Sequence, residues 1–228
     1  MLILETGRDD LLKPLQAVTG IVERKHTLPI LSNILLQSEN GQVQLLATDL
    51  EIQIHTLGEQ GAQPDFRITT NAKKLQDILR ALPDSSTVQL DLADHKLTLK
   101  AGKSRFNLQT LPAQDFPTMN VDENTSAAFA LPQETLKHMI SQVQHSMAVQ
   151  DIRFYLNGLL MQTEGNQLRL VATDGHRLAF TSATLETELP KHDVILPRKT
   201  VLELNKLLTQ PKENVVVELL DNQVRFRC

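Results

Sequence analysis

The chain has 228 residues, of which 41% are hydrophobic and 22% are charged, and its formal net charge is −4. This length allows one or two domains, and the composition is that of an ordinary soluble globular protein. The apolar runs are far shorter than the roughly 20 residues of a membrane-crossing helix, and the N-terminus lacks the basic start of a signal peptide. A single cysteine, Cys228, excludes an internal disulfide and a cysteine-based zinc site, and it favours a reducing, cytoplasmic compartment.

The first half of the sequence predicts two amphipathic helices among several strands. Apolar residues recur at helical spacing from Leu11 to Val22. The stretch Glu-Asn-Gly at residues 39–41 is typical of a hairpin turn between two strands. After another strand, Asn71 is a suitable N-cap for a helix that runs to Leu82. Further strands are expected at residues 2–5, 87–92, 97–100 and 105–110.

The second half of the sequence repeats the first. The stretch LSNILLQSENGQVQLLATDLEI at residues 31–52 matches YLNGLLMQTEGNQLRLVATDGHRLA at residues 155–179. The offset is 124 at Asn33 and 125 at Asp49, as if one residue were inserted between them. A repeat of this kind indicates tandem copies of one structural unit. The second copy predicts strands at 127–131 and 224–228, helices at 132–148 and 197–208, and a hairpin turn at 164–166.

We therefore expect an α+β fold with two tandem domains, each with two helices on one face of mostly antiparallel sheets. The first domain would span residues 1–121 and the second residues 127–228. The second copy lacks a counterpart of the strand at 105–110, so it would be incomplete, with a sheet edge that is exposed or paired with a neighbour. We expect the chain to be a fragment of a longer protein.

Basic residues concentrate in the predicted helices. The four helical segments carry five more basic than acidic residues, and the rest of the chain carries nine more acidic than basic ones. This separation favours a helix face that meets phosphates and an outer sheet that repels them. Helix propensity alone would also place Lys and Arg there. The sequence contains no recognition helix or zinc finger, so contacts with DNA would be to phosphates and independent of base sequence.

The stretch VATDGHRLAF at residues 171–180 gathers side chains that a catalytic site could use, namely Asp174, His176 and Arg177. The first copy has Asp49 at the equivalent place but reads TDLEI, without His or Arg. A Thr-Asp in both copies favours a structural role, in which Asp accepts backbone N–H groups and Gly175 supplies an unusual backbone conformation. The sequence has no nucleophile elbow or phosphate loop, and we predict neither an enzyme nor a cofactor or metal.

These residues, with the repeat, resemble the bacterial beta sliding clamps, the beta subunits of DNA polymerase III. The resemblance implies three similar domains per subunit, two subunits per ring, helices that line a DNA-sized hole, and sheets outside. This sequence would cover the first domain and most of the second, with the third domain absent. The matching stretches are LLKPLQ (11–16), TLPIL (27–31), SRFNLQTLPAQDFP (104–117), RFYLNG (153–158), VATDGHRLA (171–179) and PRK (197–199).

The resemblance also assigns site residues. The residues that would face DNA are Arg24 or Lys25, Lys73, Gln150, Phe154, Tyr155, Arg198 and Lys199. The residues that would line part of a pocket for short linear peptides are Leu156, Thr173, Gly175, His176, Arg177 and Leu178. The residues that would face the third domain of the neighbouring subunit are Lys74, Lys103, Arg105 and Leu108. The family usually has a His-Gln pair and two tyrosines where this chain has Val149-Gln150 and Phe154-Tyr155.

The function that the resemblance implies is that of a sliding clamp, a non-catalytic processivity factor that encircles duplex DNA without sequence specificity. Its partners would be double-stranded DNA and, through short linear peptides, polymerase subunits and the clamp loader, with a homodimer in the full-length protein and no membrane. Leu178 and the aliphatic parts of His176 and Arg177 would line an apolar groove, unless Leu178 is ordinary core. The alternatives are a non-clamp peptide-binding module built from the same repeats and, third, an enzyme.

Overall fold

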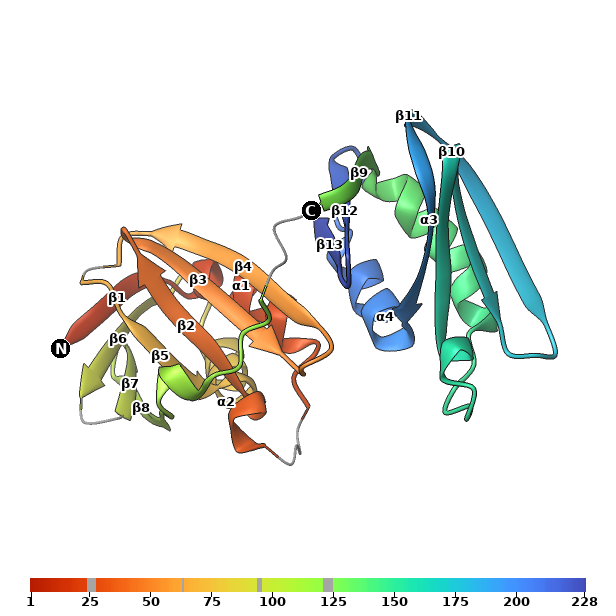
Figure 1. Ribbon diagram of the computed structural model, residues 1–228. Coiled ribbons are helices and arrows are strands. Elements are labelled where there is room, and N and C mark those ends of the chain that lie inside the picture. The colour runs from red at the N-terminus through yellow and green to blue at the C-terminus, as the bar shows by residue number, and fades with distance from the viewer. Residues whose placement is uncertain (24–27, 63, 94–95, 121–124) are drawn as a thin grey trace. The chain divides into compact units, whose positions relative to one another are not determined.

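The computed structural model describes residues 1–23, 28–62, 64–93, 96–120 and 125–228. These residues form two compact units, Met1–Met119 and Asn120–Cys228 (Figure 1). Each unit has two α-helices and antiparallel strands, so the fold class is α+β, as the sequence predicts. No helix in the described part of the chain has both the length and the apolar character needed to span a bilayer.

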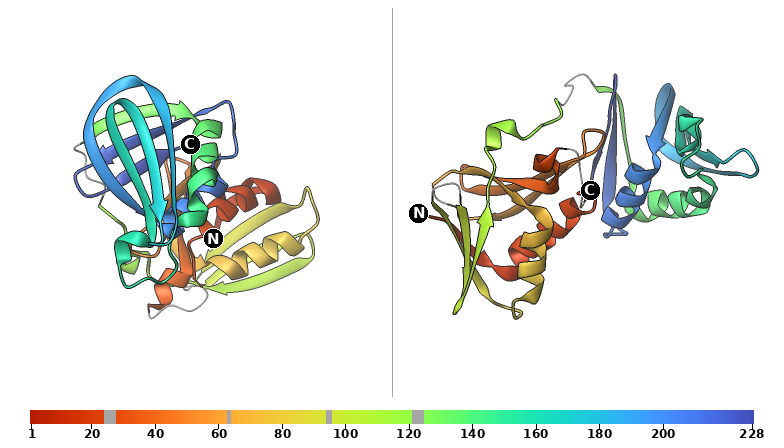
Figure 2. Two further views of the ribbon diagram at one scale, coloured as in Figure 1. Left: turned by 90° about the vertical axis from the view of Figure 1, so that its right-hand side faces the viewer. Right: turned by 90° about the horizontal axis from the view of Figure 1, so that it is seen from below.

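The first unit consists of two four-stranded antiparallel sheets and two helices. Its strands are β1 (Leu2–Gly7), β2 (Asn33–Glu39), β3 (Gln42–Thr48), β4 (Gln53–Gln60), β5 (Arg67–Asn71), β6 (Thr87–Ala93), β7 (Lys96–Ala101) and β8 (Ser104–Gln109). The strand orders are β1-β6-β7-β8 and β4-β3-β2-β5. Helices α1 (Arg8–Thr19) and α2 (Ala72–Ala81) lie side by side in the first unit (Figures 1 and 2).

The two helices form where apolar residues recur with helical spacing. Leu11, Leu15 and Val18 of α1 and Leu75 and Leu79 of α2 are almost completely buried in the core that both sheets share. Helix α1 ends earlier than its apolar pattern, which continues into the buried residues that follow the helix. The Asn71 side chain accepts a hydrogen bond from the Lys74 backbone N–H at 3.0 Å, which confirms the predicted N-cap.

The second unit repeats this arrangement with fewer, longer strands. Its elements are β9 (Thr125–Pro132), α3 (Gln133–Val143), β10 (Gly158–Thr173), β11 (Leu178–Pro197), α4 (Arg198–Leu207), β12 (Asn214–Leu220) and β13 (Val224–Arg227). One sheet pairs β10 with β11, and the other has the order β13-β12-β9. Within the described residues, this second sheet has no fourth strand that corresponds to β8.

Strand β10 folds back on itself at the predicted turn. Gly165 has a φ of +58°, and the β10–β11 register shifts on both sides of it. The Arg169 Nη1 donates to Gln162 Oε1 at 2.9 Å, although the two residues are seven positions apart in the sequence. An extended stretch of seven residues spans roughly 23 Å, so the chain reverses direction between these two residues. The hairpin predicted at 164–166 is therefore present.

The structure corrects the offset between the two copies. The Gln37 Nε2 donates to Gln44 Oε1 at 2.8 Å in the first unit, and the Arg169–Gln162 contact lies at positions larger by 125. Leu36 therefore corresponds to Met161, and both lie in the core of their own unit. Matching identical letters pairs Leu36 with Leu160 instead. In a strand this slip of one residue exchanges the inward and outward faces, so one offset of 125 holds between Leu36 and Asp49 in place of the expected insertion.

The outer faces of the two equivalent sheets differ. In the first unit the segment that follows β8 crosses the sheet (Figure 1), with Thr69 Oγ1 donating to Leu111 O at 2.8 Å and Gln53 Oε1 accepting Met119 N–H at 2.8 Å. Leu35 and Phe116 are buried, at 1% and 4% exposure, although neither belongs to the main core. The equivalent face of the second unit exposes its apolar side chains, with Phe180 at 57% and Ile195 at 46%.

Candidate functional site

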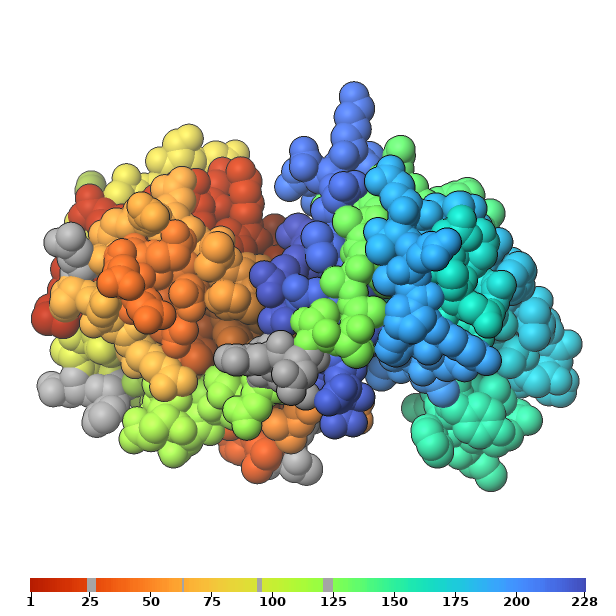
Figure 3. Space-filling view, turned by 45° about the horizontal axis from the view of Figure 1, so that its top comes forward, coloured from red at the N-terminus to blue at the C-terminus, as the bar shows by residue number. Residues whose placement is uncertain are grey.

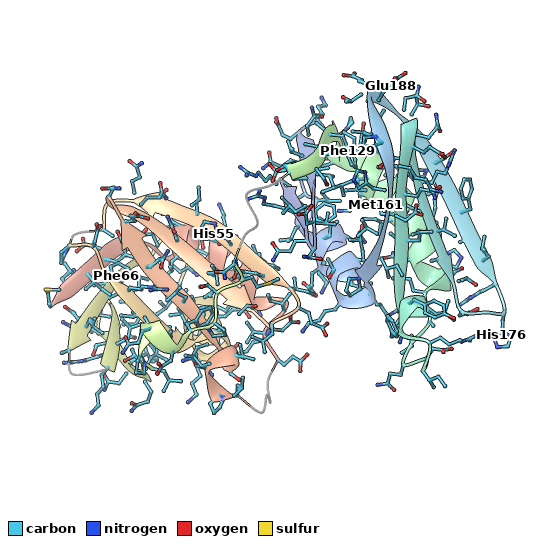
Figure 4. All side chains as sticks on the ribbon, in the orientation of Figure 1. His55, Phe66, Phe129, Met161, His176 and Glu188 are labelled. Atoms are coloured by element: carbon cyan, nitrogen blue, oxygen red, sulfur yellow. The ribbon has the colours of Figure 1, made fainter. Side chains whose placement is uncertain are left out.

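The turn at residues 173–177 connects β10 to β11 and is held by its own side chains. The Asp174 Oδ1 accepts the backbone N–H of His176 at 2.9 Å and of Arg177 at 3.0 Å. The Thr173 hydroxyl donates to Arg177 O at 2.7 Å and accepts Gly175 N–H at 3.1 Å. Gly175 has a φ of +88°. His176 lies at this end of the β10–β11 hairpin and Glu188 at the opposite end (Figure 4).

The first unit contains the same turn, built by residues 48–52. The Asp49 Oδ1 accepts Glu51 N–H at 3.1 Å and Ile52 N–H at 2.8 Å. The Thr48 hydroxyl donates to Ile52 O at 2.9 Å and accepts Leu50 N–H at 3.0 Å. Each hydrogen bond has its equivalent in the second unit. The predicted structural role of the Thr-Asp pair is therefore confirmed.

The electrostatics of the turn agree with this role. Backbone N–H groups of His176 and Arg177 lower the pKa of Asp174 from 3.8 to about 2, with a further contribution from the Arg177 guanidinium. A carboxylate with so low a pKa takes up protons poorly near neutral pH, so it is a weak general base. The Arg177 Nη2 donates to His145 O at 2.7 Å, which ties the turn to the short 3-10 helix that follows α3.

A loop at residues 148–157 protrudes beside this turn and carries exposed apolar side chains. Val149, Ile152, Phe154 and Tyr155 are exposed, at 68%, 96%, 81% and 50%. The Phe154 and Tyr155 rings meet edge to face, with centroids 5.9 Å apart. The space-filling view shows the segment around residue 150 as a separate lobe of the second unit (Figure 3). Large apolar groups in such a position are typical of a contact surface.

The loop itself is firmly held at its base. The Asn157 side chain accepts Asp151 N–H at 2.9 Å and donates to Asp151 O at 2.8 Å. The Ala148 N–H donates to Leu156 O, and the Arg198 N–H donates to Asn157 O, both at 2.9 Å. The loop is therefore fixed to the first residue of α4.

An arginine of the loop reaches the turn. The Arg153 guanidinium donates through Nε and Nη2 to the two carboxylate oxygens of Asp151, at 3.0 and 2.8 Å. A Cβ atom built on Gly175 would lie only 3.1 Å from Arg153 Nη2 and 3.3 Å from Nη1. Neither Asp151 nor Arg153 was among the site residues predicted from the sequence. The only sequence signal for this pair is the spacing of two residues between Asp and Arg, followed by an Asn that can hydrogen-bond to the loop backbone.

Two known domain families match consecutive parts of the chain. The DNA polymerase III beta subunit N-terminal domain matches residues 2–120, and the central domain of the same subunit matches residues 130–228.

The chain belongs to the DNA polymerase III beta subunit family.

Individual relatives of this family are similar over almost the whole chain. The beta sliding clamp of Salmonella typhimurium is 45% identical over 220 residues, which cover 96% of this chain and 60% of the relative. A crystal structure of the Pseudomonas aeruginosa DNA polymerase III beta subunit superposes with a TM-score of 0.94 at 42% identity, covering 100% of this chain and 62% of that one. A P. aeruginosa sliding clamp bound to griselimycin gives a TM-score of 0.91 at 43% identity, covering 99% and 61%. The chain thus spans about 60% of the length of the curated relatives it matches.

Five of the six residues predicted to line the peptide pocket of a beta subunit lie together at residues 173–178. Thr173, Gly175, His176 and Arg177 form the turn, and Leu178 begins β11 with 65% of its surface exposed. Leu178 is therefore not ordinary core. Leu156 is 9% exposed and is largely covered at the base of the loop.

The residues predicted to face DNA lie in both units. Gln150 has a φ of +58° and, with Phe154 and Tyr155, belongs to the protruding loop. The Arg198 Nη1 donates to Met147 O at 3.3 Å, and Lys199 follows it on α4. In the first unit, Lys73 Nζ donates to Thr19 O at 3.3 Å, at the C-terminal end of α1. The positions of Arg24 and Lys25 lie outside the described residues.

The residues predicted to face a neighbouring subunit differ in accessibility. Lys74 is exposed on α2, Lys103 is exposed in the turn after β7, and Arg105 is exposed on β8. Leu108 is 4% exposed and packs in the core of the first unit. Its side chain is therefore part of the unit's own packing in this chain.

Proposed function

We propose that this chain forms the first domain and most of the second domain of a sliding clamp, a processivity factor of the replicative DNA polymerase. The domains would span residues 1–121 and 127–228, and the third domain lies outside this sequence. In the full-length form two such subunits would close a ring around duplex DNA in the cytoplasm, without catalytic activity. The observation that carries the proposal is the match of two consecutive beta subunit domains in one chain.

The DNA contacts that we propose are independent of sequence and mostly electrostatic. They comprise Lys73, Arg198 and Lys199, together with Gln150, Phe154 and Tyr155 of the loop and Arg24 or Lys25. Lysine and arginine neutralise phosphates and release counterions, so binding weakens steeply as salt rises and the protein can slide. Phe154 lacks the hydroxyl that its family relatives usually carry, and its contact would be apolar.

The test is duplex binding by this chain at several salt concentrations. Fluorescence anisotropy with a labelled 20-base-pair duplex should show affinity that falls linearly with salt on logarithmic axes. Arg198→Ala together with Lys199→Ala should weaken binding and reduce the slope by about two, because roughly one counterion is released per phosphate contact. Thr200→Ala on the same helix is a matched control, because it changes no charge. Salt-independent binding would contradict the phosphate contacts and favour a peptide-binding module instead.

The groove that we propose on the second unit binds linear peptides of polymerases and of the clamp loader. The exposed Leu178 and the turn residues Thr173, Gly175, His176 and Arg177 would receive an apolar anchor such as Leu or Phe. Tethering a polymerase there raises its effective concentration at the primer end without any new contact to DNA. The griselimycin-bound sliding clamp of P. aeruginosa is consistent with a ligand site in this family.

The groove is tested with a fluorescent peptide that ends in adjacent Leu and Phe. The paired change His176→Ala and Leu178→Ala should weaken its binding to this chain at least about tenfold, since a few buried anchors dominate such interfaces. Leu57→Ala serves as the control, because Leu57 is an equally exposed leucine of the first unit, at 61%. If both variants bind the peptide as the unmodified chain does, the groove lies elsewhere.

A further inference from the structure

The loop at residues 148–157 and the turn at residues 173–178 meet through one side chain. Asp151 holds Arg153 with three hydrogen bonds, from the Arg153 backbone N–H at 2.8 Å, from Nε at 3.0 Å and from Nη2 at 2.8 Å. A bidentate pair of this kind fixes the orientation of the guanidinium plane. Arg153 lowers the pKa of Asp151 to about 2, so the pair is intact at neutral pH.

The held guanidinium occupies the space that a side chain at position 175 would need. All three of the nearest atoms to a Cβ built on Gly175 belong to it, at 3.1, 3.3 and 3.6 Å. The neighbouring His176 is also among the groups that lower the pKa of Asp151, with the smallest contribution. The Asp151–Arg153 pair therefore fills the side-chain space of Gly175 on one side and is hydrogen-bonded within the loop on the other.

The loop is hydrogen-bonded to the first residue of α4. The Asn157 side-chain amide accepts Asp151 N–H through its oxygen and donates to Asp151 O through its nitrogen, and Asn157 O accepts Arg198 N–H at 2.9 Å. A series of hydrogen bonds thus runs from Arg153, whose guanidinium fills the side-chain space of Gly175, through Asp151 and Asn157 to the first residue of α4. Packed contacts of this kind can carry coupling between two sites.

We propose that Asp151 and Arg153 are positioning residues that couple the turn at 173–178 to the loop at 148–157. A ligand that displaces Arg153 at the turn loosens the loop, and a ligand that fixes the loop holds Arg153 in place. The assignment of a peptide to the turn and of DNA to the loop rests on the proposed function. The coupling itself is a property of the unliganded chain.

The coupling is tested without any ligand, by amide hydrogen exchange in a double-mutant cycle. Gly175→Leu places a side chain where the guanidinium lies, and the exchange of the Ala148 and Asp151 N–H groups should accelerate at least about fivefold. In an Arg153→Ala background the same change should accelerate both rates much less, because only the positive-φ strain of the turn remains and no guanidinium is displaced. The smaller change Gly175→Ala should give the same pattern with a smaller acceleration.

Controls separate coupling from general loosening. Leu50→Gly alters the equivalent turn of the first unit and should leave the Ala148 and Asp151 rates unchanged. Asp151→Asn weakens the hold on Arg153 and should reduce the effect of Gly175→Leu on the Ala148 rate. Equal acceleration by Gly175→Leu with and without Arg153 would overturn the proposal, as would no acceleration in either background.

A duplex-binding arm then separates the coupling from the proposed function. With a 20-base-pair duplex as probe, Gly175→Leu should weaken affinity at least about fivefold in the unmodified background and not in the Arg153→Ala background. If the unmodified chain does not bind the duplex, the proposed DNA contact fails while the exchange cycle still decides the coupling. If the duplex binds and the cycle shows no dependence on Arg153, the coupling fails and the DNA contact stands.

Discussion

The two Thr-Asp turns have the same hydrogen bonds but different residues at the position of positive φ. The first unit has Leu50, with a φ of +79°, and the second has Gly175, with a φ of +88°. Leu50 is 49% exposed, whereas Gly175 lies against the Arg153 guanidinium. Side chains other than glycine are rare at positive φ because the Cβ crowds the backbone.

This difference shows why glycine is needed in the second unit. The hydrogen bonds of Thr48 and Asp49 are sufficient to hold Leu50 in the unfavourable conformation, so backbone conformation alone does not require a glycine. What distinguishes Gly175 is the neighbour that takes the place of its side chain. One turn is a structural connection, and the other is also a contact point for a second segment.

The largest expected effect comes from making the second turn like the first. Gly175→Leu adds positive-φ strain and forces the Arg153 guanidinium aside, which together should destabilise the second unit by about 2–3 kcal/mol. Tyr155 is the sole tyrosine and the chain has no tryptophan, so tyrosine fluorescence during urea unfolding reports on the second unit. A loss below about 1 kcal/mol would mean that Arg153 moves freely and that only the backbone resists the change.

A smaller effect is expected from removing the acceptor in the first turn. Asp49→Ala deprives the Glu51 and Ile52 N–H groups of their partner, and each such hydrogen bond contributes about 1 kcal/mol. The first unit should lose about 1–2 kcal/mol of its free energy of unfolding, measured by amide exchange of its core strands. Asp49→Asn keeps an acceptor oxygen and should recover most of the loss. Equal losses in both variants would show that the negative charge of Asp49 matters more than its hydrogen bonds.

Making the first turn like the second should change the free energy of unfolding still less. Leu50→Gly relieves strain of about 1–2 kcal/mol, but glycine also gains freedom in the unfolded chain, which offsets about 0.5–1 kcal/mol. We expect a net stabilisation of at most about 1 kcal/mol, measured by amide exchange of the first unit. Destabilisation by Leu50→Gly would reveal packing of the leucine that outweighs its strain.

The smallest effect is expected from pH, because solvent screens the second turn. The folded pKa of Asp174 lies below its ordinary value of 3.8, at about 2. A lowered folded pKa stabilises the native state above the unfolded pKa, and this stability is lost as pH falls through the folded value. The stability difference between the unmodified chain and Asp174→Asn should therefore shrink between pH 3.8 and about 2, as followed by thermal unfolding. A difference that is constant over this interval would contradict the assigned hydrogen bonds.

Much of the fold could be predicted from local patterns. The helix at 71–82 was predicted from its apolar spacing and from Asn71, and both are confirmed. The Gly-containing turn at 164–166 likewise predicted a reversal that occurs. These features depend on contacts within a few residues, which a sequence pattern records directly.

The register between the two copies was not predictable from matching letters. Identical leucines suggested an insertion, but leucine occurs on both faces of these strands, and the letter does not say which face it occupies. The cross-strand pairs Gln37–Gln44 and Gln162–Arg169 determine which residues of the two copies correspond. Leu36 in the core of the first unit then corresponds to Met161 in the core of the second.

The sequence by itself determined the tandem repeat, the helices, the two Thr-Asp turns and the resemblance to a family, because each is written in local spacing or in a match along the chain. Only the tertiary structure showed that Arg153 lies against Gly175 and that Leu178 is exposed while Leu156 is largely covered. Such facts depend on segments that are distant in sequence and adjacent in space. A sequence pattern within one segment does not show which residue of a distant segment lies beside it.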